Sequence, residues 1–183
     1  MIEEFATEKD QNGVDEFLMA LGKFVIAFER VCECMRHVVM FSLRSQGLTN
    51  QGIEQVIIGG KTSAELQVLL GAIFRQLPNQ DGEDQAKTTE LLKEIKEVTE
   101  ERNVLLHSSW QFGVEGENRL LSAIAIKFKP NQNSDSTFKV HGYAASDIHN
   151  LSLKLQSIQV RLDRLQICIT QTGFKVSTEL AKP

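Results

Sequence analysis

Apolar residues recur at steps of three and four over two long stretches of the chain, and this periodicity constrains the fold more than any other feature. One stretch runs from about residue 14 to residue 45, and its apolar positions are Phe17, Leu21, Phe24, Phe28, Val31, Met35 and Val38. The other begins at Ser146 or Asp147 as a helix cap, and its positions are Ile148, Leu151, Leu155, Ile158, Leu162, Leu165 and Ile169. Each pattern predicts a long helix whose broad apolar face must be covered by other helices or by a second subunit.

Shorter helical patterns fill the segment between these two stretches. Residues 53–58 predict a short helical piece, and a capping box of Thr62 and Glu65 opens a helix that ends at Pro78. The polar stretch NQDGEDQAK is expected to be a solvated loop. It leads into a helix from about residue 83 to residue 108 with the apolar seam Leu91, Ile95, Val98 and Leu105.

The period changes to an alternation of apolar and polar residues after Trp110. The runs at residues 122–128 and 138–143 predict a small antiparallel β-hairpin, which WQFGV can join as a third strand. We expect Trp110 to anchor the hairpin to the core. The sequence therefore predicts a mostly α fold, a four- to five-helix bundle with a small antiparallel β-hairpin insertion. We expect a single domain over residues 1–183, with frayed tails at 1–12 and 174–183.

Composition narrows the class of protein. The net charge is −4, from 20 basic and 24 acidic residues, which argues against a protein that coats duplex DNA or anionic membrane through bulk charge. The chain has no apolar run of roughly 18 residues, and its N-terminus is acidic and polar, so we expect a soluble, cytoplasmic protein without a membrane span. The three cysteines fit a reducing compartment. Because Cys32 and Cys34 would point about 200° apart on a helix, we interpret them as small buried residues in place of metal ligands.

One residue breaks the seam of the helix at residues 83–108. Counting about 100° per residue from Leu91 places Arg102 at a seam position, where a buried guanidinium without partners would cost several kcal/mol. This helix must therefore face a polar cleft, an acidic partner or an anionic ligand at that level. A structural alternative is that Glu29 or Glu33 of the first helix neutralises Arg102, or that Arg102 complements the helix dipole.

The string ERNVLLHSSW carries Arg102, Asn103 and His107, and with the order of the surrounding helices it resembles the HEPN family. The resemblance implies a metal-independent endoribonuclease that needs no cofactor, with a composite site formed by two motifs across a homodimer. It implies attack of an RNA 2′-hydroxyl on the adjacent phosphorus, with cyclic 2′,3′-phosphate and 5′-hydroxyl products, and a role in defence or stress. A regulatory protein encoded elsewhere is a further expectation. Ser109 stands where the toxin subgroup with a nucleotidyltransferase partner tends to carry tyrosine, which weakens that particular assignment.

The residue types suit this chemistry. His107 can exchange a proton near neutral pH, and the guanidinium fork of Arg102 can stabilise charge on the phosphate oxygens. Asn103 can hold a phosphate oxygen or orient the imidazole. Candidate RNA contacts on the outer face of the hairpin are Lys127, Lys129 and Lys139. The alternative is a non-catalytic dimeric binding module for a nucleotide, RNA or protein partner.

Overall fold

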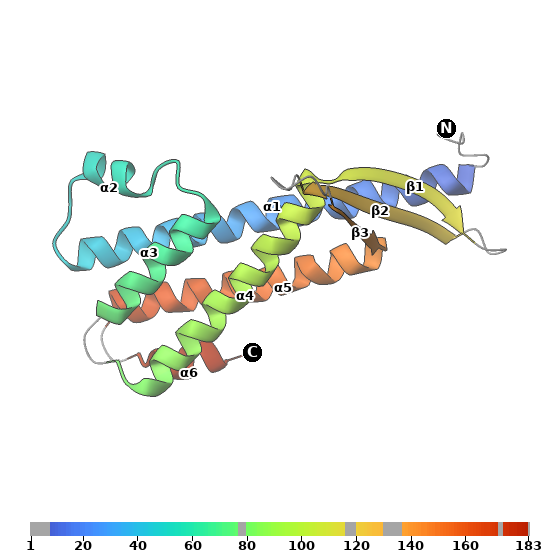
Figure 1. Ribbon diagram of the computed structural model, residues 1–183. Coiled ribbons are helices and arrows are strands. Elements are labelled where there is room, and N and C mark those ends of the chain that lie inside the picture. The colour runs from blue at the N-terminus through green and yellow to red at the C-terminus, as the bar shows by residue number, and fades with distance from the viewer. Residues whose placement is uncertain (1–7, 77–79, 116–119, 130–136, 172–173, 183) are drawn as a thin grey trace. The chain divides into compact units, whose positions relative to one another are not determined.

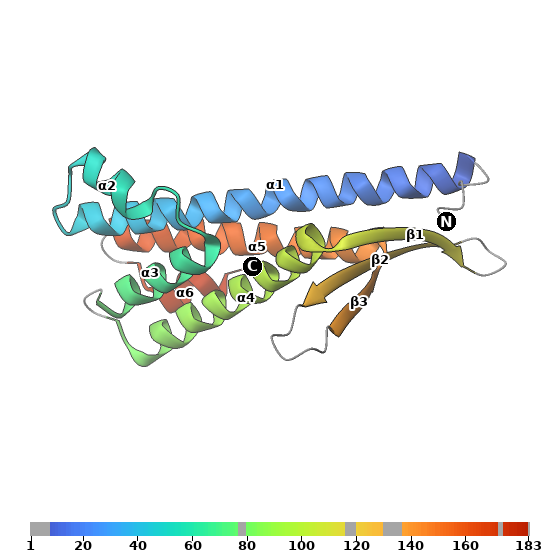
Figure 2. The same cartoon turned by 45° about the horizontal axis from the view of Figure 1, so that its top comes forward.

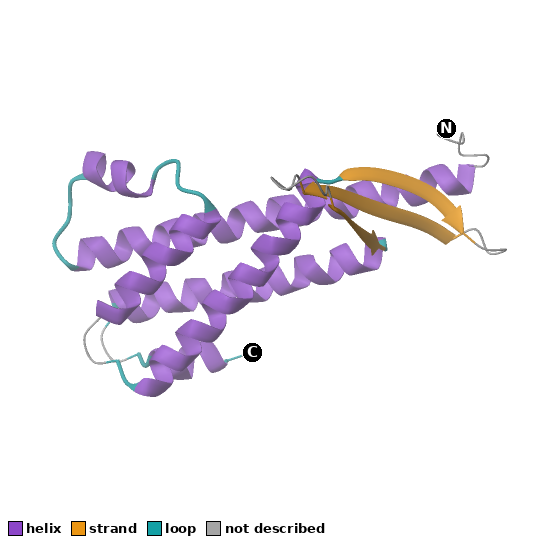
Figure 3. Ribbon diagram, in the orientation of Figure 1, coloured by secondary structure: helices purple, strands orange, loops and turns teal. Residues whose placement is uncertain are grey.

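The computed structural model of the chain describes residues 8–76, 80–115, 120–129, 137–171 and 174–182, with side chains at 8–10, 114–115, 120–122, 127–129 and 137–138 left aside. The described elements, in chain order, are α1 (Glu8–Ser45), α2 (Gln51–Ile58), α3 (Ser63–Gln76), α4 (Gly82–His107), β1 (Ser109–Glu115), β2 (Leu120–Lys129), β3 (Thr137–Tyr143), α5 (Ala145–Thr170) and α6 (Val176–Ala181). Figure 3 shows helix over most of the chain and strand only between α4 and α5. The predicted mostly α fold with a small β insertion is confirmed.

The apolar faces of the two longest predicted patterns form much of the core. In α1 the fully or nearly buried positions include Val14, Phe17, Phe24, Phe28, Val31, Cys32, Met35, Val38 and Val39. In α5 they are Ile148, Leu155, Ile158, Leu162 and Leu165, while Leu151 and Ile169 are half-buried. These helices form because the apolar side chains share one face and removing that face from water stabilises the fold.

The chain divides into two compact units. Unit 1 comprises Met1–Ile26 and Glu100–Leu153, and unit 2 comprises Ala27–Thr99 and Lys154–Pro183. The helices α1, α4 and α5 each continue from one unit into the other, so neither unit is a contiguous stretch of chain. The single domain expected over residues 1–183 stays a prediction.

The sheet of unit 1 has the order β1-β2-β3 with both pairs antiparallel, so WQFGV does provide a third strand. Trp110 pairs with Ala125 and Phe112 with Ala123, which places the two rings on one face. The ring of Phe17 lies edge-on to both, with centroids 5.0 Å from Trp110 and 5.5 Å from Phe112. This face therefore packs on the N-terminal part of α1 (Figure 1), and Trp110 is the predicted core anchor.

In unit 2, α2 is attached to the end of α1 by a two-bond ion pair. Arg44 Nε donates to Glu54 Oε1 at 2.7 Å and Arg44 Nη2 to Glu54 Oε2 at 2.8 Å. The hydrogen bonds from Arg44 lower the pKa of Glu54. The helices α3 and α4 lie side by side in Figures 1 and 2. Ser63 Oγ contacts Thr99 Oγ1 at 3.0 Å and Gly71 approaches Leu92, so the two helices run antiparallel.

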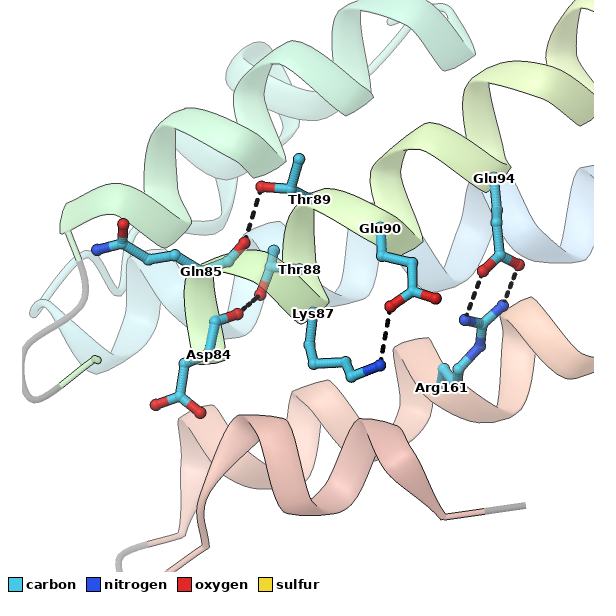
Figure 4. Close-up of polar contacts among 8 residues, drawn as sticks. All are labelled: Asp84, Gln85, Lys87, Thr88, Thr89, Glu90, Glu94 and Arg161. Carbon is cyan, nitrogen blue, oxygen red and sulfur yellow. Dashed lines mark hydrogen bonds and ion pairs between the residues drawn. The ribbon is translucent and has the colours of Figure 1, made fainter. Parts of the chain in front are cut away.

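The helix α4 also contacts α5 and α6 within unit 2. Glu94 forms a bidentate pair with the guanidinium of Arg161 on α5, which Figure 4 shows. In the first turn of α4, Asp84 Oδ1 accepts a hydrogen bond from the backbone N–H of Ser177 at 2.7 Å, although the two residues lie 93 positions apart in the chain. The carboxylate of Asp84 therefore ties the start of α4 to α6.

The expectation of a frayed tail at residues 174–183 is wrong. Val176, Ser177 and Leu180 of α6 are buried, because the helix packs its apolar side inward and hydrogen-bonds Asp84. The expected tail at residues 1–12 also needs correction, since α1 begins at Glu8 and not near Val14. Residues 1–7 lie outside the described part of the chain.

Candidate functional site

The predicted seam of α4 is buried at every apolar position: Leu91, Ile95, Val98 and Leu105. Arg102 lies at the seam position between Val98 and Leu105 and is half-buried. Asn103 is also half-buried, and His107, the last residue of α4, is exposed. The helix thus changes from an apolar seam to a polar end within unit 1, as the sequence predicts.

The structure brings Arg102, Asn103 and His107 together. Arg102 Nη1 lies 3.4 Å from Asn103 Oδ1, to which it donates, and 3.2 Å from His107 Nε2. A guanidinium can only donate, so this contact is a hydrogen bond in the tautomer whose Nε2 carries no proton. The imidazole therefore lies directly beside a permanent cation.

Two contacts fix the helix end that carries this group. Trp110 Nε1 donates to the backbone carbonyl of Leu105 at 2.9 Å, and the Tyr143 hydroxyl donates to Glu101 Oε2 at 2.9 Å. Burial, and then the hydrogen bond to Glu101, raises the pKa of Tyr143 well above its usual range. The sequence does not predict the contact of Glu101 with Tyr143, because the two residues lie 42 positions apart and no local pattern signals it.

Glu29 and Glu33 were predicted as carboxylates that support Arg102. Glu33 contacts two neighbours on its own helix, with Oε2 3.2 Å from Arg36 Nη1 and Oε1 3.2 Å from His37 Nε2. Glu29 is exposed. Their support of Arg102 stays a prediction.

The pairing of β2 with β3 determines where the lysines of the predicted basic patch lie. Lys139 is exposed and pairs directly with Lys127 across the two strands, and Lys129 pairs with Thr137. Alternation along β3 puts Lys139 on the same face as Tyr143, whose ring lies 5.8 Å from Trp110. Lys139 therefore lies on the same face of the sheet as Trp110, which is the face that packs on α1. The sequence predicts the outer face, so that part of the prediction is wrong. The side chains of Lys127 and Lys129 lie outside the described residues.

The cysteines are placed as small core or part-buried groups. Cys32 is buried, and the Cys34 thiol donates to Asp163 Oδ1 at 3.5 Å. Burial, followed by the charge and hydrogen bond of Asp163, raises the pKa of Cys34 to about 12. Among the residues described, no three His, Cys, Asp or Glu side chains gather as metal ligands would.

Comparison with known proteins assigns no function to the site. No family model matches the chain, and no curated protein or solved structure is significantly similar to it. Within the described ranges, no single helix has both the length and the apolar character to cross a membrane. The adjacent helices α2 and α3 reach that length and apolar character only when they are counted together, and the chain bends by 119° between them.

Proposed function

We propose that the chain is a HEPN-like, metal-independent endoribonuclease whose site is the Arg102, Asn103 and His107 group. The observation that carries this proposal is the 3.2 Å separation of Arg102 Nη1 and His107 Nε2 at the exposed end of α4. A phosphate oxygen bound by this guanidinium would lie within reach of the imidazole. The permanent cation and the proton acceptor are thus adjacent, as phosphodiester cleavage requires.

The proposed reaction uses these groups in a defined order. An RNA phosphate takes over the donors of Arg102, and His107 Nε2 is then available to accept the proton of the 2′-hydroxyl. The 2′-oxygen forms a bond to phosphorus and the bond from phosphorus to the 5′-oxygen breaks. The leaving 5′-oxygen takes a proton from a protonated imidazole, which we assign to His107 of a second copy in a homodimer. Asn103 keeps the guanidinium in position through its Oδ1.

The test is cleavage of labelled single-stranded RNA in the presence of EDTA. We expect cyclic 2′,3′-phosphate and 5′-hydroxyl ends, and a rate that falls about 10²- to 10⁴-fold in His107→Ala. Arg102→Lys keeps the charge but loses the planar fork, so it should also lose most activity. His149→Ala is the matched control, because His149 is an exposed histidine elsewhere in unit 1. Metal dependence, or full activity of His107→Ala with its fold intact, would disprove the mechanism.

The alternative is a non-catalytic dimeric module that binds a nucleotide, RNA or a protein. The observation that favours it is that the guanidinium contacts Asn103 and His107 of its own helix, an arrangement that also suits a structural helix end. Intact RNA after long incubation, together with RNA binding that Arg102→Ala weakens, would identify the module. A defence or stress role and a separate regulatory protein belong to the same proposal and need tests in cells.

A further inference from the structure

The part of α1 that belongs to unit 1 exposes large apolar side chains on the side away from the sheet. Leu18, Met19 and Ile26 are 50%, 61% and 59% exposed. Met19 and Ile26 each follow a buried phenylalanine, Phe17 and Phe24, by two residues and therefore point about 200° away from it. Single apolar residues are ordinary at a protein surface, but residues that share one face of a helix form a patch.

Gly22 lies in the middle of this patch. Leu18 and Ile26 lie four residues before and after Gly22, and Met19 lies three residues before it, so all of them share one face of the helix. Gly22 is itself exposed. We call the surface formed by Leu18, Met19, Gly22 and Ile26 the α1 patch.

The packing of the chain gives no reason for a glycine at this position. Glycine is among the least favourable residues in the interior of a helix. A Cβ added at Gly71 would lie 3.3 Å from Leu92 Cδ1, so a neighbouring helix accounts for that glycine. A Cβ added at Gly22 would meet no heavy atom within 4 Å. Gly22 therefore weakens α1 without making room for another part of the described chain, and a close approach from outside the chain would explain it.

The shape of the α1 patch suits a second helix. Side chains four residues apart form ridges along a helix, and in the commonest packing such ridges of two helices interdigitate. Leu18, Gly22 and Ile26 form one such ridge, with a notch at Gly22. Two helices that cross at the notch come close together, and the apolar side chains on both sides of the crossing then contact each other.

The charges beside the α1 patch indicate which helix it receives. Glu16 and Lys23 are exposed and lie seven residues apart, which puts both on one flank of the patch, with Glu16 before Gly22 and Lys23 after it. When two copies of α1 cross antiparallel, these flanks meet with their order reversed, so the two lysines lie between the two glutamates. A parallel crossing would instead place the charged flank of each copy against the Leu18 side of the other. The charges are therefore complementary to those of an antiparallel second copy.

We propose that the α1 patch binds the α1 patch of a second copy of this chain, with the two helices crossing antiparallel at Gly22. The contact is isologous, since each copy offers the same surface. A crossing of two helices covers a small area, so the dimer dissociates in the micromolar range. The proposal rests on α1 alone and holds whether or not the chain cleaves RNA. Sedimentation tests this contact and RNA cleavage tests the nuclease, so the failure of one is distinguishable from the failure of the other.

The test is sedimentation equilibrium of the full chain from low micromolar to several hundred micromolar concentration. We expect a reversible monomer–dimer equilibrium. Gly22→Gln should weaken the dimer at least tenfold, because the side chain fills the notch. In dilute protein, where the wild type is a monomer, the same variant should raise the Tm by about 1–3 °C, because glutamine is the better helix former. A residue with only a structural role would not change association and stability in opposite directions.

Further variants test the apolar contacts. Met19→Gln and Ile26→Gln should each weaken the dimer. Leu153→Gln is the matched control, because Leu153 is a 48% exposed leucine on α5 in the same unit, and it should leave the dimer unchanged.

A charge exchange tests the direction of the crossing. Lys23→Glu should weaken the dimer, and the double variant Glu16→Lys with Lys23→Glu should restore it. Failure of the double variant to restore the dimer would overturn the antiparallel crossing. A wild type that stays a monomer at every concentration would overturn the proposal, and so would a dimer that neither Gly22→Gln nor Ile26→Gln weakens.

Discussion

Replacing Asp84 by alanine should release α6 from the start of α4. Asp84 Oδ1 accepts a hydrogen bond from the Ser177 N–H at 2.7 Å. Both residues are buried, with Asp84 3% exposed and Ser177 2% exposed. A hydrogen bond to a charged group contributes about 1.5–3 kcal/mol, and its removal leaves a buried N–H without an acceptor. At about 2–4 °C per kcal/mol for a chain of this size, Asp84→Ala should lower the Tm by about 3–12 °C.

A matched pair of variants separates this contact from general effects of charge. Glu83→Ala removes a carboxylate from the same first turn of α4, but Glu83 is exposed and its contact with Lys175 lies at the surface, so its effect should be much smaller. Hydrogen exchange provides the local measurement: amides of residues 176–181 should lose protection in Asp84→Ala and keep it in Glu83→Ala. Equal Tm changes in both variants, with α6 still protected, would refute this account of the tail.

Two further predictions follow from groups whose pKa is shifted. Because the pKa of Cys34 is raised to about 12, iodoacetamide at pH 8 should label it about a hundredfold more slowly than an ordinary cysteine. This factor already allows for the greater nucleophilicity of a more basic thiolate. Peptide mass spectrometry measures the labelling, and rapid labelling of Cys34 would contradict the prediction. Arg44 lowers the pKa of Glu54 in the folded chain, so the pair stabilises the fold above the unfolded pKa of about 4.3 and loses that effect as the pH falls through the folded value. The difference in unfolding free energy between wild type and Glu54→Gln should therefore shrink as the pH falls below the unfolded pKa of about 4.3 and through the lower folded value, and a constant difference would contradict the assignment.

The parts of the fold that the sequence predicts are those with a local periodic signal. Phe24 and Ile158 lie on apolar stripes that repeat for many turns, so their burial follows from spacing alone. The short helix α6 has no such repeat, and its partner Asp84 lies 93 residues earlier in the chain. Propensity within a six-residue helix is too weak to decide its state, and only the tertiary contact does so.

The candidate site and the polar loop before α4 likewise combine features that a local sequence pattern predicts with features that only long-range contacts determine. Arg102 and His107 lie five residues apart on one helix, so their proximity can be predicted from helical geometry. The contact between Glu101 and Tyr143 depends on how the sheet folds back and has no local signal. Gln80 was expected in a solvated polar loop, yet both of its amide atoms are buried, because the burial of a loop residue is set by the packing of its neighbours and not by its own polarity.

The proposed endoribonuclease mechanism predicts how activity depends on the number of intact chains in a dimer. Within the described group one chain offers one imidazole, whereas the proposed reaction needs both a proton acceptor and a proton donor. If the acid is His107 of a second copy, activity requires two intact chains in one dimer. In dimers assembled at random from wild-type and His107→Ala chains, activity should then follow the square of the wild-type fraction, about a quarter of the full rate in an equal mixture. A single chain that supplies every catalytic group would give about half. A linear dependence, or a monomer in sedimentation at micromolar concentration with cleavage intact, would therefore remove the composite site while leaving Arg102 and His107 as candidates.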